Sequence, residues 1–240
     1  MNKFITLIAA AGLVFSSAVA QDPSATEDWT HKPPVVNPGC KNNPPSDAII
    51  LFGKAKDLSN WVGRSGPAQW KTFCRHMTVN GTGDIMTKEK FGDCQLHVEF
   101  RTPAKVIGEG QEQGNSGVYI QSLYELQVLN SYDNETYYNG QAGSMYKQSA
   151  PLVNASKKPG KWQVYDIVFH APRFADDGSL TKPATITVIH NGVLVQDHFE
   201  LKGPTLYAGT PKYEKHGEMP FLLQDHGNPV KYRNVWIRRL

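Results

Sequence analysis

Glu99, Glu125 and His226 are the side chains of this sequence whose chemical types suit proton transfer, since a carboxylate or an imidazole can accept or donate a proton. Each glutamate stands in a short segment in which apolar and polar residues alternate, and His226 follows a third segment of the same kind. A reactive site needs such groups on one surface, so the segments that carry them decide whether they can act together.

Glu125 belongs to the stretch Gly114–Tyr132, which we interpret as two strands joined by a tight link. Its apolar residues recur at a spacing of two, so one face of each strand can pack against a core. The opposite face carries an aromatic ring, two amides and a carboxylate, from Tyr119, Gln121, Gln127 and Glu125. We interpret this face as a binding surface, with an ordinary solvated sheet face as the alternative.

Glu99 belongs to a second alternating segment, in which its polar face also carries His97 and Arg101. In a third segment, Gln224 and His226 share a face. Polar groups that converge from several strands predict a curved sheet with a concave cleft for a sugar-sized ligand. The alternatives are that Glu99 and Arg101 form only a structural ion pair and that His97 is a packed residue.

Residues 1–20 have the features of a secretory signal, with a basic start at Lys3, an apolar run too short to span a bilayer, and small residues up to Ala20. We therefore expect an exported, periplasmic or secreted protein without a membrane span. Removing this segment takes away one Lys and no acid, so the formal net charge of +3 falls by one. A charge so close to zero, with dispersed Lys and Arg, argues against a nucleic-acid partner.

The sequence has three cysteines, which allow at most one intramolecular disulfide. The spacing does not decide which pair forms, and we favour Cys40 with Cys74, which would tie the start of the chain to the domain. Cys94, on the apolar face of its strand, then packs as a small hydrophobic residue. Because the cysteine spacing matches no zinc motif, we expect no required cofactor or metal, although a divalent ion is compatible with the fold.

The order of segments predicts one all-β domain. Residues 21–46 hold six of the sixteen prolines and form an expected extended lead before a domain of residues 47–240. Short strands follow at close spacing, and the clearest hairpin turns at Asn191-Gly192. No long helical pattern is present, so the sequence indicates a single β-sandwich of jelly-roll type. A loop over residues 133–156 offers aromatic rings for stacking on a ligand, from Tyr137, Tyr138 and Tyr146, with anchoring of the loop as the alternative role of these rings.

The chain contains, in this order, the runs LFGKAKDLSNW, GTGDIMTKEKFGDCQLHVEFRTP, GNSGVYIQSLYELQVLNSY, KWQVYDIVFHAPRF and FLLQDHGNPVKYRNVWIRRL. Together they resemble successive motifs of the 3-keto-disaccharide hydrolase domain family, over nearly all of residues 47–240. The resemblance implies a concanavalin A-like, glucanase-type jelly roll and an exported hydrolase of glycosides whose sugar carries a ketone at carbon 3. It also implies a functional link to a sugar 3-oxidoreductase, which would make that ketone.

The reaction that the resemblance implies begins at carbon 2 of the sugar. A ketone at carbon 3 opposes the positive charge of an ordinary glycosidase transition state, but it acidifies the hydrogen at carbon 2. A base can remove that proton, the enolate can expel the anomeric substituent, and water can add to the product. The route needs a base, an acid near the leaving group and hydrogen-bond donors around the ketone oxygen.

Strand position and motif position suggest which residues fill these roles. Glu99 or Glu125 is the expected base or acid, and His226 is the other proton carrier, because an unperturbed imidazole has a pKa of about 6.5. Arg101 and Lys88 are expected to stabilise the enolate charge. The expected substrate contacts are Asn115, Tyr119, Gln121, Gln127 and Gln224.

Two other functions remain open at the level of sequence. A conventional jelly-roll β-glucanase has the pattern E-x-D-x-x-E, and aligning it on Glu125 puts Gln127 and Asn130 where two of the three acids should be. An amide cannot act as a nucleophile or a general acid, so that mechanism should fail here. A non-catalytic carbohydrate-binding module, or lectin, would use the same polar face. Clustering of the proton carriers in one cleft would favour an enzyme.

Overall fold

The computed structural model describes residues 22–40 and 43–240. The predicted signal segment, residues 1–20, lies outside the described residues. Among the described residues, no helix is long and apolar enough to cross a membrane.

The chain divides into two units after Val35. The described part of the first unit holds one 3-10 turn, η1 (Pro23–Thr26). The side chain of Asp22 caps this turn by accepting a hydrogen bond from the Ser24 N–H at 3.0 Å. Every strand that the structure describes lies in the second unit, which begins at Val36.

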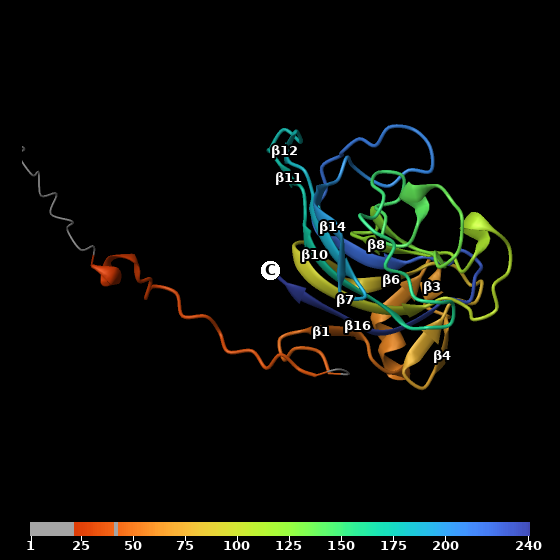
Figure 1. The fold of residues 1–240 in the computed structure, drawn as a ribbon. Coiled ribbons are helices and arrows are strands. Elements are labelled where there is room, and N and C mark those ends of the chain that lie inside the picture. The colour runs from red at the N-terminus through yellow and green to blue at the C-terminus, as the bar shows by residue number, and fades with distance from the viewer. Residues whose placement is uncertain (1–21, 41–42) are drawn as a thin grey trace, which may run out of the picture. The chain divides into compact units, whose positions relative to one another are not determined.

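The second unit is built from two sheets and a small hairpin. The larger sheet runs in the order β14 (Val193–Glu200), β13 (Thr185–His190), β10 (Gln163–His170), β7 (Cys94–Arg101), β16 (Lys231–Arg239), β5 (His76–Thr78) and β4 (Lys71–Phe73), and β1 (Ile49–Phe52) pairs with β16. The smaller sheet runs in the order β3 (Gly66–Pro67), β2 (Trp61–Gly63), β6 (Ile85–Phe91), β15 (Met219–Leu223), β8 (Ser116–Ile120) and β9 (Tyr124–Val128). The remaining elements are the hairpin β11 (Arg173–Phe174) and β12 (Leu180–Lys182) and the 3-10 turns η2 (Ala55–Asn60), η3 (Gly110–Glu112) and η4 (Tyr138–Gly140). Figure 1 shows β10, β7 and β16 as neighbours in the larger sheet.

Both sheets turn their apolar residues toward one shared core. Leu96 and Phe100 on β7 and Leu126 and Val128 on β9 are at most 1% exposed and belong to the same buried cluster. The alternation predicted for these strands is therefore correct. Full burial of a side chain such as Leu126 contributes about 1.5–3 kcal/mol, so the packing of the two apolar faces holds the sheets together. The predicted all-β sandwich, a concanavalin A-like jelly roll, is confirmed.

Two hairpin turns differ in how visible they are in the sequence. Asn191 and Gly192 have φ of 54° and 85° and join β13 to β14, as the Asn-Gly pair predicted. Gln121 and Ser122 also have positive φ, 52° and 54°, and begin the link between β8 and β9. Gln121 therefore lies in the turn and not on the polar face of β8, so that prediction was wrong. Neither Gln nor Ser favours positive φ, so the sequence carries no signal for this turn. Gln121 Nε2 donates instead to the carbonyl of Phe91 at 2.9 Å.

The three cysteines are free thiols in the structure. Cys40 and Cys74 are both exposed, so the favoured disulfide between them is not formed. Cys94 is buried in the core, as predicted, and burial raises the pKa of its thiol to about 12. Such a thiol stays protonated and unreactive at neutral pH.

Candidate active site

The structure places the two candidate carboxylates on different sheets. Glu99 lies on β7 and is directed out of the larger sheet, whereas Glu125 lies on β9 and is directed out of the smaller one. Since the apolar faces of both sheets meet in the core, these two outer faces lie on opposite sides of the sandwich. The prediction that the polar groups share one concave cleft is therefore wrong for this pair. Alternation shows which residues of a strand share a face, but not which sheet the strand joins.

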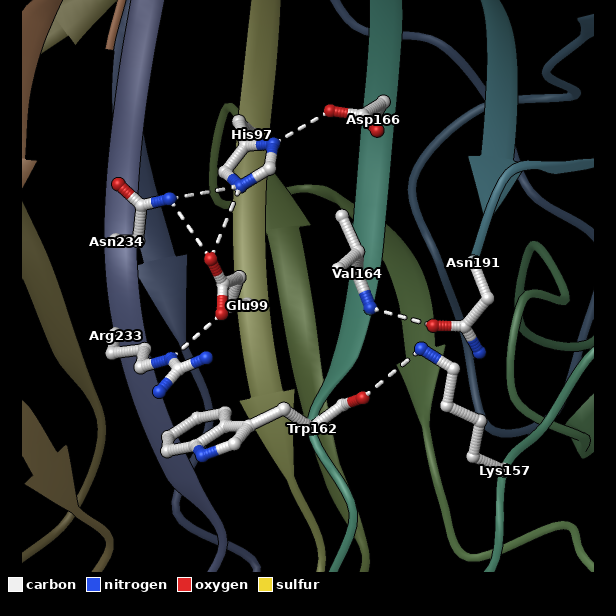
Figure 2. A network of polar contacts seen from close by, with 9 residues as sticks. All are labelled: His97, Glu99, Lys157, Trp162, Val164, Asp166, Asn191, Arg233 and Asn234. Atoms are coloured by element: carbon white, nitrogen blue, oxygen red, sulfur yellow. Dashed lines mark hydrogen bonds and ion pairs between the residues drawn. The ribbon is translucent and has the colours of Figure 1, made fainter. Parts of the chain in front are cut away.

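Glu99 is held by several hydrogen bonds on the larger sheet (Figure 2). Its oxygens accept from Arg233 Nε at 2.6 Å and from Asn234 Nδ2 at 2.9 Å, and His97 Nε2 lies 3.8 Å away. Burial alone would raise the pKa of Glu99, but hydrogen bonds from His97, Asn234 and Arg233 lower it to about 2. The carboxylate therefore stays ionised and is a poor proton acceptor. It forms a structural ion pair, although with Arg233 rather than with the expected Arg101.

His97 is the centre of the same network. Its Nδ1 is 2.6 Å from Asp166 on β10, and its ring stacks on Trp236 with centroids 5.1 Å apart and planes 6° from parallel. Burial alone would lower the pKa of His97, but the carboxylates of Asp166 and Glu99 raise it to about 9. An imidazole enclosed in this way fits the interpretation of His97 as a packed residue (Figure 2).

Glu125 has the opposite surroundings. Glu125 is only 4% exposed. Among the described residues, only the Tyr119 hydroxyl donates a hydrogen bond to its carboxyl group, at 2.8 Å. Burial raises the pKa of Glu125 to about 7, although the hydrogen bond from Tyr119 partly opposes this shift. Near neutral pH both protonation states are therefore populated. A carboxyl group in this state is suited to take a proton in one step and return it in another.

Tyr119 and Gln224 are the polar side chains next to the Glu125 carboxyl group. Burial and the neighbouring Glu125 raise the pKa of Tyr119, so the phenol stays protonated and acts as a donor. Gln224 Nε2 is 3.4 Å from the Tyr119 oxygen, and Gln224 Oε1 is buried with no hydrogen-bond partner among the described residues. An unpaired buried acceptor costs free energy, so a bound ligand hydroxyl could satisfy it.

A groove of about 670 Å³ lies on the smaller sheet, lined by residues of β6 and β15 and of the loops around β2 and β3, and Tyr119 and Glu125 are not among its lining residues. Strand register puts Met86, Leu222, Tyr119 and Glu125 in one row across β6, β15, β8 and β9. Met86 and Leu222 form part of the groove wall, and Tyr119 is next in the row. The polar side chains that line the groove include Arg64, Gln69, Asp84 and Asp225.

Three tyrosines and a lysine lie along the other side of Glu125. The backbone N–H of Tyr146 donates to the Glu125 carbonyl at 3.1 Å, which holds the loop 133–156 beside β9. The Tyr146 hydroxyl is 2.6 Å from that of Tyr137. The Lys147 ammonium lies 3.8 Å from the centre of the Tyr137 ring and 5.5 Å from that of Tyr207. The strand edge at Glu125 is therefore flanked by aromatic rings of this loop and by a cation that was not predicted. The stacking of Tyr137, Tyr138 and Tyr146 on a ligand stays a prediction, and the contact between the Tyr137 and Tyr146 hydroxyls fits the alternative that they anchor the loop.

Two of the predicted sugar-binding amides are used within the fold. Gln127 is 1% exposed, and its Nε2 donates to Gln111 Oε1 at 2.9 Å. Asn115 is 4% exposed, and its Nδ2 donates to the Gln111 carbonyl at 2.7 Å. Both amides fasten the short loop that contains η3 to the sheet, so in this structure neither presents its donor to the groove.

Lys88 lies on β6 of the smaller sheet and His226 follows β15 of the same sheet, and neither has a hydrogen bond to Glu125 among the described residues. His226 is exposed in the turn after β15, two residues beyond Gln224. The Asp225 carboxylate shapes that turn by accepting from the N–H groups of Gly83 and Gly227. Lys88 is exposed on β6, and its catalytic role, like that of His226, stays a prediction.

Arg101 is separated from these residues. It lies on β7 in the larger sheet, with its guanidinium 4.9 Å from the centre of the Trp162 ring. It shares a face with Glu99 and lies on the opposite side of the sandwich from Glu125, so it could stabilise an enolate only at Glu99, and that role stays a prediction. Arg64, Asp84 and Lys147 were not among the predicted residues, because they lie in loops or next to a strand end, where no alternation marks a face.

The chain resembles proteins of known structure over almost its whole length. The model of the 3-keto-alpha-glucoside-1,2-lyase-like domain family matches residues 47–238. A solved structure from Parabacteroides distasonis ATCC 8503, described as a candidate glycosyl hydrolase, is 48% identical, covers 91% of this chain and 97% of its own, and has a TM-score of 0.87. Two others from that organism, with the same description, are 18% and 22% identical, cover 81% and 80% of this chain and 94% and 99% of their own, and have TM-scores of 0.59 and 0.54, which shows a shared fold. No functionally curated protein matches the chain. The family match spans nearly all of the second unit, and the chain therefore belongs to the 3-keto-alpha-glucoside-1,2-lyase-like domain family.

Proposed function

We propose that this protein cleaves glycosides whose sugar carries a ketone at carbon 3, with Glu125 as the base. The observation that carries the proposal is the buried Glu125 carboxyl, whose pKa is raised to about 7 and which only Tyr119 holds among the described residues. The family that the chain belongs to and the glycosyl-hydrolase description of its 48% identical relative support a glycoside as the substrate class.

The first step is removal of the proton at carbon 2. The ketone acidifies this hydrogen, and the Glu125 carboxylate takes it while the C–H electron pair becomes the enolate. A carboxylate whose pKa is raised to about 7 is a stronger base than an ordinary one and is still partly ionised at neutral pH. Tyr119 orients the carboxylate through its hydroxyl donor.

The second step is elimination. The enolate electrons re-form the ketone and a carbon 1–carbon 2 double bond, and the bond to the anomeric oxygen breaks. The leaving oxygen needs a proton, which protonated Glu125 or the predicted carrier His226 can supply. The Lys147 ammonium, beside Tyr146, lies on the Glu125 side of the sheet and is our candidate to offset the enolate charge.

Hydration completes a net hydrolysis. If Glu125 protonated the leaving oxygen, its carboxylate takes a proton from water, the hydroxyl adds to carbon 1, and Glu125 passes that proton to carbon 2. If His226 protonated the leaving oxygen, Glu125 returns its own proton to carbon 2 and the proton of water restores His226. Both routes leave the Glu125 carboxylate ionised. No step passes through an ordinary oxocarbenium ion, and none needs the second and third acids of the glucanase pattern. The amides at those positions are engaged elsewhere, Gln127 with Gln111 and Asn130 with Gln113.

The test is to incubate the protein in heavy water with a 3-keto-glucoside and, separately, with its unoxidised parent. We expect release of the aglycone from the ketone alone, with deuterium entering at carbon 2. Hydrolysis of the parent without deuterium would contradict the elimination route and support a conventional glucanase. Binding of saccharides without turnover of either compound would replace the proposal with a carbohydrate-binding module.

A further inference from the structure

A row of cations lies on the outer face of the larger sheet, on the opposite side from Glu125. Lys231 on β16 and Arg101 on β7 are direct partners in the strand register, and Thr78 and Lys71 continue the row on β5 and β4. Like charges directly opposite each other on neighbouring strands repel and destabilise a sheet. Among the described residues no acid forms an ion pair with Lys231 or Arg101. The repulsion is therefore not relieved within the fold.

Other groups near this pair add to its positive field. Arg233, two residues after Lys231, is neutralised by Glu99, whose side chain is only 9% exposed. The pKa of His76 on β5 is lowered by burial first and then by the charges of Lys231, Arg101 and Arg233. The lowered pKa of His76 is a sign of the positive field around Lys231 and Arg101, the two cations of this group that no acid neutralises among the described residues.

Aromatic rings stand among these cations. The Trp162 ring centre is 4.0 Å from the Arg233 guanidinium carbon and 4.9 Å from that of Arg101 (Figure 2 shows Trp162 beside Arg233). The His76 ring packs edge-on to Trp162 at 6.4 Å and to Phe73 at 5.9 Å. Phe73 is 71% exposed. We name these residues the basic aromatic patch, which consists of Phe73, His76, Arg101, Trp162, Lys231 and Arg233.

We propose that the basic aromatic patch is a second carbohydrate-binding surface, which holds a polysaccharide that bears carboxylate groups of the uronate type. Guanidinium groups bind carboxylates with two parallel hydrogen bonds, and aromatic rings offer apolar faces to sugar rings. A neutral keto-sugar could not offset the repulsion between Lys231 and Arg101, so the occupant differs from the proposed substrate at Glu125. The two surfaces lie on opposite faces, so the protein could hold an acidic polymer while the groove stays open.

Single-stranded nucleic acid is another polyanion that binds cations and aromatic rings. The whole-chain composition favours the polysaccharide, because 25 Lys and Arg are balanced by 22 Asp and Glu. A nucleic-acid surface normally carries a much larger excess of positive charge. The polysaccharide is therefore the occupant to which we commit.

The test is affinity electrophoresis of the full chain in gels that contain polygalacturonate or neutral dextran, with an oligothymidylate mobility shift in parallel. The informative variant is Arg101→Gln/Lys231→Gln. Lys182→Gln/Lys212→Gln removes the same total charge from two exposed lysines elsewhere on the chain and is the control for charge. At about 50 mM salt, where screening is weak, we expect polygalacturonate to retard the protein and dextran not to.

The expected result is a loss of at least about tenfold in polygalacturonate affinity for Arg101→Gln/Lys231→Gln and nearly none for the control pair. The thermal midpoint of Lys231→Gln should equal or exceed that of the unchanged protein, since one of two repelling charges is gone. Equal losses in both double variants, absence of retardation, or binding of the oligothymidylate in place of polygalacturonate would each overturn the proposal. A lower thermal midpoint for Lys231→Gln would contradict its physical premise.

Discussion

Glu125 and Glu99 show how the same side chain acquires opposite properties from its surroundings. Glu125 is buried beside one neutral donor, Tyr119, so its pKa is raised to about 7. Glu99 receives donors from Arg233 and Asn234, so its pKa is lowered to about 2. A general base must be both ionised and basic near neutral pH, and of these two carboxylates only Glu125 meets both conditions.

The first residue-level prediction concerns the pH dependence of the reaction. We expect kcat/KM for a 3-keto-glucoside to rise with pH through an apparent pKa of about 7, because the ionised form of Glu125 is the base. Tyr119→Phe removes the hydrogen bond that lowers this pKa, so the apparent value should move upward. Rate profiles of both proteins check this, and a downward shift in Tyr119→Phe would contradict it.

The raised pKa of Glu125 also predicts how the stability of the protein depends on pH. The pKa of Glu125 in the folded protein, about 7, is above its ordinary value of 4.5, so the folded state keeps a proton that the unfolded state has released. The free energy of unfolding should therefore fall as pH rises from about 4.5 to about 7. Glu125→Gln removes this dependence and should stabilise the protein at high pH by on the order of 3 kcal/mol. Urea unfolding at about pH 5 and about pH 8 measures both effects, and a less stable variant at the higher pH would be inconsistent with a strained carboxylate.

At the level of elements, Glu99 ties β7 to β16 through Arg233 and Asn234. Its lowered pKa means that it stabilises the fold above about pH 4.5 and that this contribution is lost as pH falls toward about 2. We expect Glu99→Gln to lower the free energy of unfolding at neutral pH by about 2 kcal/mol, after allowance for the exposure of Arg233. Asp47→Asn, which breaks an exposed pair with Arg238, should change it little. Denaturant titrations of the two variants compare their free energies of unfolding. Equally small changes in both variants would show that the hydrogen bonds of Glu99 do not stabilise the pairing of β7 with β16.

The strands also show what local pattern predicts and what it does not. Alternation correctly assigned the core-facing residues of β7 and β9, such as Leu96 and Leu126, because side-chain direction is a property of each strand alone. It failed at Gln121, since a turn with positive φ at Gln and Ser has no residue signal of the Asn-Gly kind. Burial of Gln127 could not be foreseen either, because the loop that covers it comes from another part of the chain.

For the whole molecule, the resemblance predicted the family and the sandwich, and the structure was needed to show on which face of the sandwich each candidate residue lies. A sandwich has two outer faces, one on each sheet. Which sheet a strand joins depends on pairing between distant segments, such as β16 with β7 and β15 with β8. Asp84, beside β6, acts electrostatically on Tyr119 of β8 only because β15 pairs with both strands. Export and the link to a sugar 3-oxidoreductase stay predictions.

The measurement that tests the central claim most directly is kcat/KM for a 3-keto-glucoside in Glu125→Gln and Glu99→Gln, two variants with the same chemical change on opposite faces. We expect Glu125→Gln to lose on the order of a hundredfold or more, as for loss of a general base, and Glu99→Gln to remain close to the unchanged protein while it is folded. Thermal midpoints of both variants serve as the control for folding. Full activity in Glu125→Gln, with loss in folded Glu99→Gln, would contradict the account and move the active site to the larger sheet.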